Sequence, residues 1–342
     1  MSMIIEDGGI LTSVQDGGRF GFEQFGVSPS GPMDFKSMHI ANILVDNDLG
    51  ESCLEITFMG PRIRFSSPAV LAVAGADCSP ALNGMPVPMC QAFAVKNGDV
   101  LKLGMIKNAC RSYLAVADGI KVPVLMNSKC TMLNQKFGGH EGRRLQKNDV
   151  LELEKSIATL PNMQLRKASQ PPFPNGEHVL RVIMGPQDDM FTDEGLHSFL
   201  NGVYTVGQEF NRQGYRLSGP KITHKKDGNI ISDGIATGSV QVPTAGQPIV
   251  MLSERQTVGR YTKIATVITV DLPVIGQCKT GDKLRFRAVS IDEAQDLYIA
   301  HYREMDALRR SVNGTIRYKP AINLAVTVAG ETYNVQVEER EE

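Results

Sequence analysis

Short stretches of alternating apolar and polar residues recur along most of the chain. Val, Ile, Leu and Thr dominate these stretches, and Gly, Pro, Asn or Asp bound them, as in AVLAVAG, SYLAVA, VLELE and KLRFRAVS. Many short strands separated by such turn residues are typical of a β-sandwich or β-barrel. The pattern therefore predicts a mainly β fold. Hairpins are expected to close at Asn97–Asp99, Asn148–Asp149 and Gly281–Asp282.

Three segments have the spacing of helices instead. Asp34 is the expected N-cap of a helix over residues 35–46, whose apolar residues gather on one face. Gln187–Gly202 is predicted to form one amphipathic helix or two short turns. The third helix is expected over Ser290–Ser311, where carboxylates in the first turn suit the helix dipole.

The chain also contains a motif that occurs twice. MGPRIRF (Met59–Phe65) is followed downstream by NGDVLKLG, and SGPKITH (Ser218–His224) is followed by TGDKLRFR. The repetition suggests two copies of one barrel, although Gly-Asp turns are common enough to recur by chance.

A chain of 342 residues is longer than one hydrophobic core usually supports, so more than one domain is expected. The Pro- and Ser-rich stretch between the two motif copies is the natural linker. The expected organisation is a first barrel with a substrate loop at 1–160, a linker at 161–177, a second barrel at 178–290, and a C-terminal helix and β-hairpin extension at 291–342.

Charge and composition exclude several classes of partner. The net charge is −1 and no run of Lys or Arg exceeds two residues, so neither nucleic acid nor a membrane surface is an expected partner. No signal peptide and no apolar run long enough to cross a bilayer is recognisable, which predicts a cytoplasmic protein. The six cysteines are scattered and are expected to be small buried residues. Neither a metal-ligand spacing nor a phosphate-binding loop is present, so no metal is predicted.

A long polar loop near the start of the chain carries the strongest functional signal. Ser13–Asp34 reads SVQDGGRFGFEQFGVSPSGPMD, which is long for a connector and rich in glycine and hydrogen-bonding side chains. Similar chemistry recurs at Asn127–Leu151, Met184–Phe191, Glu209–Gly219 and Ser239–Tyr261. Such residue types bind small carboxylates and amides, since guanidinium groups match carboxylates and glycine lets the backbone approach a ligand. For any single residue, a structural role in a turn or a surface ion pair is the alternative interpretation.

Several motifs taken together resemble a known family. They include TSVQDGGRFGFEQFGVSPSGPMD, LEITFMGP, RSYLAVADGI, GGHEGRRLQKNDVL, FNRQGYRLSGP and SVQVPTAGQPIVMLSERQTVGRYTKIATVI, in this order. The region from Ile10 to Ser290 is similar to the biotin-dependent carboxyltransferase family, also called KipA-like proteins or allophanate hydrolase subunit 2. The C-type subunit of bacterial 5-oxoprolinase is a member of this family.

The resemblance implies two cyclophilin-like β-barrels and a protein that works in a complex. The implied partners are a KipI-like B-type subunit and the A-type subunit of 5-oxoprolinase, with the substrate cleft where subunits meet and a higher oligomer possible. In that complex ATP, with Mg, would drive the opening of 5-oxoproline, a lactam, to L-glutamate. The end of the chain resembles the first strands of a biotinyl domain but lacks the M-K-M turn, so no covalent biotin is expected.

The resemblance also selects the candidate site residues. Gln15, Asp16 and Arg19 are the catalytic candidates, which are expected to orient the substrate amide, with Asp16 as a candidate general base. The substrate-binding candidates are Ser30, Gly31, Met33, Asp34, Arg212, Arg216, Gln241 and Glu254. The two arginines of this set are expected to bind a carboxylate or a phosphate.

Two other functions remain open at this point. One is the carboxyltransferase half of an enzyme that acts on urea or another amide, with carboxybiotin delivered by a separate carrier. The other is a KipA-type antagonist of a KipI-like kinase inhibitor that performs no chemistry. The chain departs from many relatives at Asp118, Cys130, Glu254 and Arg260. Its loops are therefore expected either to bind a variant ligand or to tolerate these sequence changes without a change in function.

Overall fold

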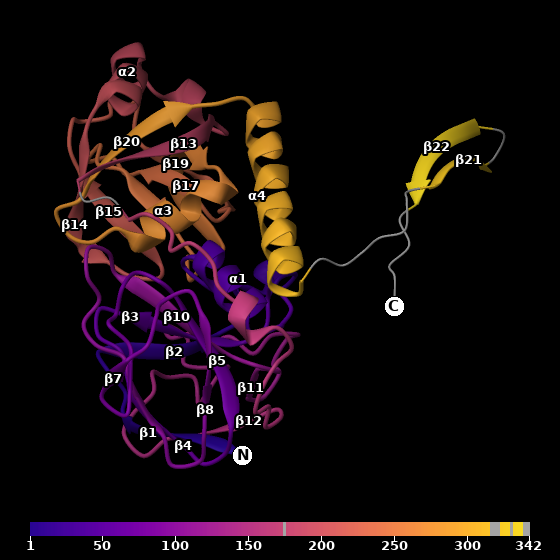
Figure 1. Ribbon diagram of the computed structural model, residues 1–342. Coiled ribbons are helices and arrows are strands. Elements are labelled where there is room, and N and C mark those ends of the chain that lie inside the picture. Colours follow the sequence, from indigo (N-terminus) through magenta and orange to yellow (C-terminus); the bar gives the residue numbers. More distant parts are fainter. Residues whose placement is uncertain (174–175, 315–321, 329–330, 338–342) are drawn as a thin grey trace.

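Two groups of β-strands, one from each half of the chain, stand one above the other with a long helix beside them (Figure 1). The computed structural model describes residues 1–173, 176–314, 322–328 and 331–337. The two groups have separate apolar cores. A third apolar cluster lies between the first group and two of the helices. The predicted mainly β fold with two barrels is confirmed.

The first barrel consists of two antiparallel sheets. The seven-stranded sheet has the order β11-β12-β1-β4-β9-β6-β7, and the five-stranded sheet has the order β2-β3-β10-β5-β8. The strands are β1 (Ser2–Asp7), β2 (Leu11–Gln15), β3 (Cys53–Thr57), β4 (Arg62–Phe65), β5 (Ala69–Gly75), β6 (Ala81–Leu82), β7 (Met85–Pro86), β8 (Ala92–Val95), β9 (Val100–Lys102), β10 (Arg111–Val116), β11 (Ile120–Lys121) and β12 (Val150–Leu153).

The five-stranded sheet is buried on both faces. On β3, Leu54 and Ile56 point into the barrel core, whereas Cys53 faces the cluster around helix α1 (Phe35–Leu44). Because side chains alternate along a strand, Glu55 lies on the same outer face as Cys53. A charged residue is therefore placed between the first barrel and the elements packed against it.

The second barrel is a sheet that closes on itself. Its order is β13-β20-β14-β15-β18-β17-β19-β16, and the additional pairing of β13 with β19 completes the ring. β13 and β20 pair in parallel, and β16 adds to β19 outside the ring. The strands are β13 (Glu177–Met184), β14 (Tyr204–Phe210), β15 (Gly214–Ser218), β16 (Asn229–Gly234), β17 (Ser239–Val242), β18 (Ile249–Met251), β19 (Val258–Val267) and β20 (Lys283–Ala288).

The predicted helices form at the predicted caps. The Asp34 side chain accepts a hydrogen bond from the backbone N–H of Ser37 at the start of α1, and Ser290 does the same for Glu293 at the start of α4 (Ile291–Val312). The segment after Gln187 forms two elements, as one of the alternatives predicted. The remaining helices are η1 (Glu23–Phe25), η2 (Met163–Leu165), η3 (Asp188–Met190), α2 (Asp193–Asn201), η4 (Thr269–Asp271) and α3 (Leu272–Gln277).

The predicted turns form, but the prediction that they close hairpins is wrong. Asn97–Asp99 connects β8 of one sheet with β9 of the other. Asn148–Asp149 leads from a loop into β12, and Gly281–Asp282 leads from the end of α3 into β20. The residues of a turn determine a local reversal of the chain, whereas the partner of the next strand depends on long-range contacts.

The repeated motif does not occupy equivalent places in the two barrels. In the first copy, β4 pairs directly with β9, and Arg62 lies opposite Lys102. In the second copy, His224 forms an isolated bridge with Phe191, while β20 pairs with β13 and β14. The motif thus predicts the number of barrels but not their strand pairing.

The other expectations concern the C-terminal region, the cysteines and the membrane. β21 (Ile322–Val328) and β22 (Glu331–Val337) form the expected hairpin, whereas the exact domain boundaries stay a prediction. All six cysteines are buried and unpaired, as predicted. In the described part of the chain, no helix is both long and apolar enough to cross a membrane.

Candidate functional site

The opening loop, Ser13–Asp34, is fastened to the first barrel by its predicted catalytic residues. One oxygen of Asp16 accepts hydrogen bonds from the backbone N–H of Gly18, at 2.9 Å, and from the hydroxyl of Ser128, at 2.7 Å. The other oxygen accepts from the backbone N–H of Lys129, at 2.5 Å. Asp16 therefore joins the loop to the segment 128–130.

Arg19 and Gln15 bind backbone carbonyl groups in and next to this segment. The Arg19 side chain is fully buried, donates to the carbonyl oxygens of Leu125 and Cys130, and lies 4.7 Å from the ring centre of Phe137. The Gln15 side chain donates to the carbonyl oxygen of Thr131. Arg19 Nη1 and Gln15 Oε1 have no hydrogen-bond partner among the described residues. The predicted role of these residues in contacting substrate stays a prediction.

Arg212 connects the two barrels through a buried cluster of charges. It lies between β14 and β15, and its guanidinium donates to Glu254 at 2.6 Å and to Glu55 of β3 at 2.5 Å. It also donates to the Ser30 hydroxyl and to the carbonyl oxygen of Gly31 in the opening loop. The structure thus brings together four predicted site residues, but in the junction between the barrels.

Glu55 is the centre of this cluster on the side of the first barrel. It accepts hydrogen bonds from the Tyr113 hydroxyl at 2.6 Å and from the backbone N–H of Met33 at 2.8 Å. Burial alone would raise the pKa of Glu55, but the charges of Arg212 and Arg111 outweigh burial and hold this pKa below its usual value. Glu55 is therefore ionised at neutral pH.

Three residues of this cluster were not predicted from the sequence: Glu55, Arg111 and Tyr113. Each lies in a strand whose residues are all buried, so the three were interpreted as parts of ordinary β-strands. The available signal was the charge itself, because Glu and Arg are rarely fully buried unless they are paired.

Asp34 belongs to the same junction. Besides capping α1, its carboxylate accepts a hydrogen bond from Gln277 of α3 at 2.7 Å. The Gln277 amide also pairs with both backbone groups of Arg111 in β10. Burial raises the pKa of Asp34 against the opposing effect of its hydrogen bonds from Gln277 and Ser37. The predicted residue Asp34 therefore joins α1 to the second barrel.

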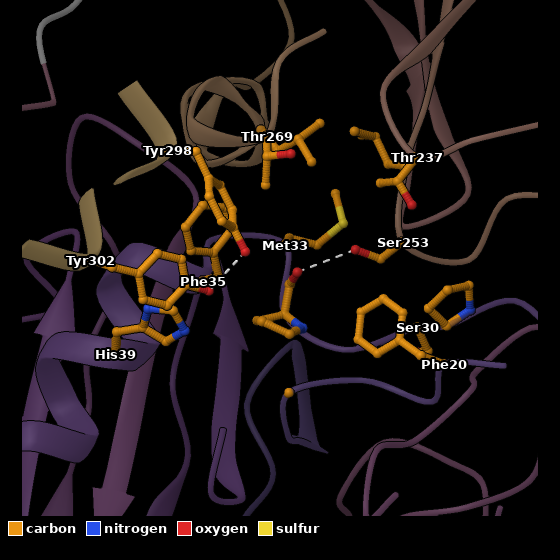
Figure 2. Close-up of a pocket in the computed structure, with 15 residues that line it drawn as sticks. Phe20, Ser30, Met33, Phe35, His39, Thr237, Ser253, Thr269, Tyr298 and Tyr302 are labelled. Carbon is orange, nitrogen blue, oxygen red and sulfur yellow. Dashed lines mark hydrogen bonds between the residues drawn. The ribbon is translucent and has the colours of Figure 1, made fainter. Parts of the chain in front are cut away.

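A cavity of about 390 Å³, the loop cavity, lies beside the opening loop (Figure 2). Aromatic side chains from the loop, α1 and α4 dominate its lining, and its polar groups are mostly hydroxyls. Two predicted residues, Ser30 and Met33, line it. Its lining includes no Lys, Arg, Asp or Glu side chain. The loop cavity therefore suits a flat apolar group better than a small charged molecule.

Two histidines meet where α1 and α4 pack at the edge of the loop cavity. His39 Nδ1 lies 3.2 Å from His301 Nε2, and both side chains are buried. Burial, together with the neighbouring His301, lowers the pKa of His39 to about 3. Burial also lowers the pKa of His301. Both imidazoles are consequently neutral at physiological pH.

A second cavity, of about 290 Å³, opens on the second barrel and contains the predicted residues Arg216 and Gln241. We call it the amide cavity, because four carboxamides line it together with one guanidinium and one phenol: Asn211, Gln213, Gln241, Gln256, Arg216 and Tyr261. Arg216 forms an exposed ion pair with Glu209 at 2.8 Å. Gln241 is buried, and its Nε2 atom has no hydrogen-bond partner in the described structure.

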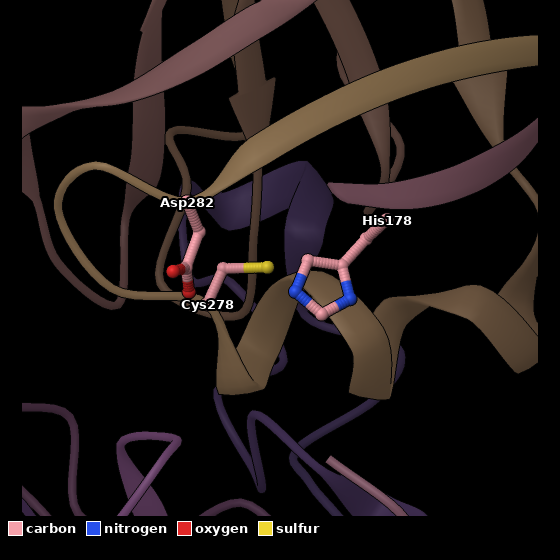
Figure 3. Close-up of side chains that lie close together, drawn as sticks. All are labelled: His178, Cys278 and Asp282. Atoms are coloured by element: carbon pink, nitrogen blue, oxygen red, sulfur yellow. The ribbon is translucent and has the colours of Figure 1, made fainter. Parts of the chain in front are cut away.

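Three possible metal ligands, His178, Cys278 and Asp282, lie within 4.8 Å of one another (Figure 3). Both oxygens of Asp282 already accept hydrogen bonds from Lys279, and the Cys278 thiol donates to the carbonyl oxygen of Val274. Burial raises the pKa of the Cys278 thiol, which disfavours the thiolate that a metal needs. These contacts give no support to a metal site, and its expected absence stays a prediction.

Comparison with known proteins gives a consistent result. The carboxyltransferase domain, subdomains A and B, matches residues 25–288. The C-type subunit of 5-oxoprolinase from Escherichia coli is 36% identical over 84% of this chain and 91% of its own length. The corresponding subunit of Haemophilus influenzae is 32% identical over 88% of this chain and 96% of its length. A putative urea carboxylase of Emericella nidulans is 34% identical over 84% of this chain, but over only 24% of its own length.

Solved structures show the same fold. The urea amidolyase of Kluyveromyces lactis superposes with a TM-score of 0.83 at 31% identity, over 90% of this chain. The urea carboxylase of the same organism gives a TM-score of 0.83 at 28% identity, over 99% of this chain. The chain spans 20% and 32% of these two larger proteins, respectively.

Proposed function

The chain belongs to the family of carboxyltransferase domains with subdomains A and B, and we propose that it acts as the C-type subunit of an ATP-dependent 5-oxoprolinase. In the proposed reaction a water oxygen adds to the lactam carbonyl carbon of 5-oxoproline. The ring C–N bond breaks, the nitrogen takes up a proton, and L-glutamate is released. A KipI-like B-type subunit and an A-type subunit would complete the enzyme.

The observation that carries this proposal is the extent of the match to separate subunits. The chain covers 91% and 96% of two 5-oxoprolinase C-type subunits, so it corresponds to nearly the whole of each. In contrast, it covers about a quarter of the putative urea carboxylase. Both relatives are named as one subunit of 5-oxoprolinase, so we infer that this chain also acts with partner chains.

Neither the loop cavity nor the amide cavity provides a site for ATP. A triphosphate requires several cations or a row of backbone N–H groups. The loop cavity is lined by no Lys, Arg, Asp or Glu, and its His39 is neutral; the amide cavity offers one guanidinium beside the carboxylate of Glu209. We propose that ATP and Mg bind on the partner subunits or at their junction with this chain.

The buried candidate residues would support the reaction by positioning loops. Arg212 donates to four protein oxygen atoms and is 4% exposed, so its guanidinium has little capacity left for substrate. Asp16 and Arg19 are similarly engaged with the segment 125–130. A small polar amide remains the expected substrate, because exposed polar side chains still line the amide cavity.

The likeness to urea carboxylase supports one alternative. A TM-score of 0.83 over nearly the whole chain means that a carboxyltransferase acting on urea would have the same two barrels. In that case a separate carrier would deliver carboxybiotin, and the product would be a carboxylated amide rather than an amino acid.

A substrate panel distinguishes the two functions. The complex purified with its co-expressed partner subunits is incubated with ATP and either 5-oxoproline or urea, the latter with a biotin carrier, its carboxylase and bicarbonate. We expect ADP and glutamate with 5-oxoproline and no carboxylated product with urea. Carboxylation of urea without any ring opening would replace the proposed function by the alternative.

A further inference from the structure

The amide cavity has a composition that matches one kind of small molecule. A carboxamide offers both donors and acceptors, so several of them around one space complement an amide, which has both kinds of group. Arg216 adds the single positive charge of this lining, and Tyr261 adds a hydroxyl at the rim. The lining also includes Glu209, the ion-pair partner of Arg216, so it is complementary to an amide that carries a negative charge once a ligand carboxylate replaces Glu209 at Arg216.

Gln241 is the buried member of this lining. It lies on β17, is 1% exposed, and its Nε2 atom has no partner among the described residues. A buried amide without a partner is unfavourable, and a hydrogen-bonding ligand can relieve that cost. A Cβ atom at Gly259 would lie 2.8 Å from this Nε2 atom, so the glycine at 259 leaves room for the amide.

The charged junction between the barrels holds the loops that form the cavity. In the segment 211–213, Arg212 points into the junction, whereas the neighbouring Asn211 and Gln213 are exposed and line the cavity. The backbone N–H of Glu254 donates to the carbonyl oxygen of Arg212, and Gln213 donates to Gln256 at 3.0 Å. The ion pairs of Arg212 thereby fix the positions of three cavity carboxamides.

Arg216 is available to a ligand. Its partner Glu209 is 78% exposed, and Arg216 itself is 51% exposed. Exposed ion pairs contribute little to stability, so a ligand carboxylate can replace Glu209 at little cost. A guanidinium that binds a carboxylate with two parallel hydrogen bonds also fixes the orientation of the ligand.

We propose that the amide cavity is the substrate-binding site and that it takes a small cyclic amide bearing a carboxylate, as 5-oxoproline does. Arg216 binds the carboxylate, and the carboxamides of Gln241 and Gln256 bind the lactam group. This proposal rests on the proposed function for the identity of the ligand. The loop cavity is lined by no Lys or Arg and so offers no charge-assisted contact to that carboxylate.

The test is a calorimetric titration of the assembled complex without ATP, using 5-oxo-L-proline and pyrrolidin-2-one, the same ring without a carboxylate. The variants are Arg216→Leu, Gln256→Leu and Gln241→Leu, and Arg285→Leu is the control. Arg285 is also an arginine of the second barrel paired with a glutamate, Glu177; its side chain is 42% exposed and lies outside the cavity. Arg216 and Gln256 are both exposed, so their variants are expected to fold.

We expect wild type and the Arg285→Leu variant to prefer 5-oxoproline over pyrrolidin-2-one. The Arg216→Leu variant should bind 5-oxoproline about 10-fold or more weakly and lose this preference, because a charge-assisted contact is gone. The Gln241→Leu and Gln256→Leu variants should weaken both ligands. Unchanged affinity in the Arg216→Leu and Gln256→Leu variants, or no binding of 5-oxoproline to wild type, would overturn the proposal.

Turnover separates this proposal from the proposed function. Glutamate formation with normal KM in the Arg216→Leu and Gln256→Leu variants would support the proposed reaction and rule out the amide cavity as the substrate-binding site. Binding that responds to the variants as expected, without any glutamate formation, would support the amide cavity as a binding site and rule out the proposed reaction.

Discussion

Arg212 and its two glutamates illustrate how single residues hold the barrels together. All three side chains are at least 95% buried, and the guanidinium contacts Glu55 from one barrel and Glu254 from the other. Taking charges out of water is costly, and their mutual attraction offsets that cost only when geometry and hydrogen bonds are good. Such a cluster contributes more to the geometry of the junction than to net stability.

Replacing Arg212 by an uncharged residue is therefore expected to destabilise the folded protein strongly. Arg212→Leu leaves the buried carboxylate of Glu254 without a cation and leaves Glu55 with only Arg111, whose Nε lies 3.8 Å away. The free energy of unfolding should therefore fall by about 3–5 kcal/mol. Arg216→Leu removes an exposed ion pair and should change it by about 1 kcal/mol or less. Urea denaturation followed by circular dichroism measures both, and equal effects of the two substitutions would contradict the buried cluster.

The contact between His39 and His301 predicts a pH dependence. The folded protein holds the pKa of His39 at about 3, below its ordinary value of 6.5, so the unfolded chain binds the proton more readily. The free energy of unfolding is therefore highest near and above pH 7 as far as His39 is concerned, and it falls as the pH drops below 6.5. At pH 5 the protonation of this histidine in the unfolded chain lowers it by about 2 kcal/mol. The loss between pH 7 and pH 5 should be smaller by that amount in His39→Gln.

Urea denaturation at the two pH values measures this difference. His197→Gln is the control, because His197 is exposed on α2. The same loss of stability in wild type and His39→Gln would show that the pair does not titrate as described.

The sequence identified several residues of the buried charged cluster but did not predict their contacts. Arg212, Glu254, Ser30 and Gly31 were selected as substrate ligands, and the structure places them in one cluster, in contact with each other. Glu55, the partner that explains the cluster, could not be identified because only the folded chain brings β3 against the second barrel.

Among the elements, the opening loop is fastened to the first barrel by hydrogen bonds at both of its ends. Its residues Asp16 and Arg19 make buried hydrogen bonds to the segment 125–130, and Ser30 donates to the carbonyl oxygen of Thr131. Long loops in compact domains are commonly functional, and a binding loop is most precise when a scaffold holds it.

Arg19→Ala should weaken the attachment of the opening loop to the segment 125–130. The buried carbonyl oxygen of Cys130 loses its donor and that of Leu125 loses one of two, so the loop should open more often and turnover by the complex should fall strongly. Chymotrypsin should then cleave faster after Phe20 and Phe25, which are 68% and 72% exposed. Limited proteolysis and a glutamate assay measure the two effects.

Arg144→Ala provides the control, because Arg144 is an exposed arginine whose guanidinium donates to the carbonyl oxygen of Ile10. It should match wild type in both measurements. A wild-type cleavage rate in Arg19→Ala would show that the loop is held by other contacts.

The elements themselves were largely predictable. The alternating pattern identified the strands, and N-cap residues located the starts of α1 and α4. Helix α3 was missed because its few residues follow a strand-like run without a break. Turn residues did not predict strand partners, since the chain crosses between sheets at Asn97–Asp99.

At the scale of the whole molecule, the barrels pack so closely that a glycine is required between them. A Cβ atom at Gly276 of α3 would lie 2.2 Å from the carbonyl oxygen of Met33 in the opening loop. Because that neighbour is backbone, it cannot move aside without shifting the loop.

Gly276→Ala should therefore lower the free energy of unfolding by about 1–3 kcal/mol. Gly234→Ala on β16 is the matched control, because a Cβ atom there meets nothing within 4 Å, and its effect should stay within about 0.5 kcal/mol. Thermal denaturation of both variants measures the difference. A Gly276→Ala variant as stable as the control would mean that the barrels can separate freely.

The repeated motif and the resemblance to a family predicted two barrels, but neither predicted the arrangement of their cavities. The residues of the amide cavity come from β14, β15, β17, β18 and β19 and from the loops between them. Their meeting depends on the closure of the second barrel, a long-range property that no local pattern contains.

The central claim is that this chain is an essential component of an enzyme that opens 5-oxoproline at the expense of ATP. The most direct measurement is the amount of glutamate and ADP formed by the partner subunits alone and after the purified chain is added back. Glutamate should appear only after the addition, in step with ADP. Equal glutamate formation with and without the chain, or ADP formation without glutamate in the complete complex, would contradict it.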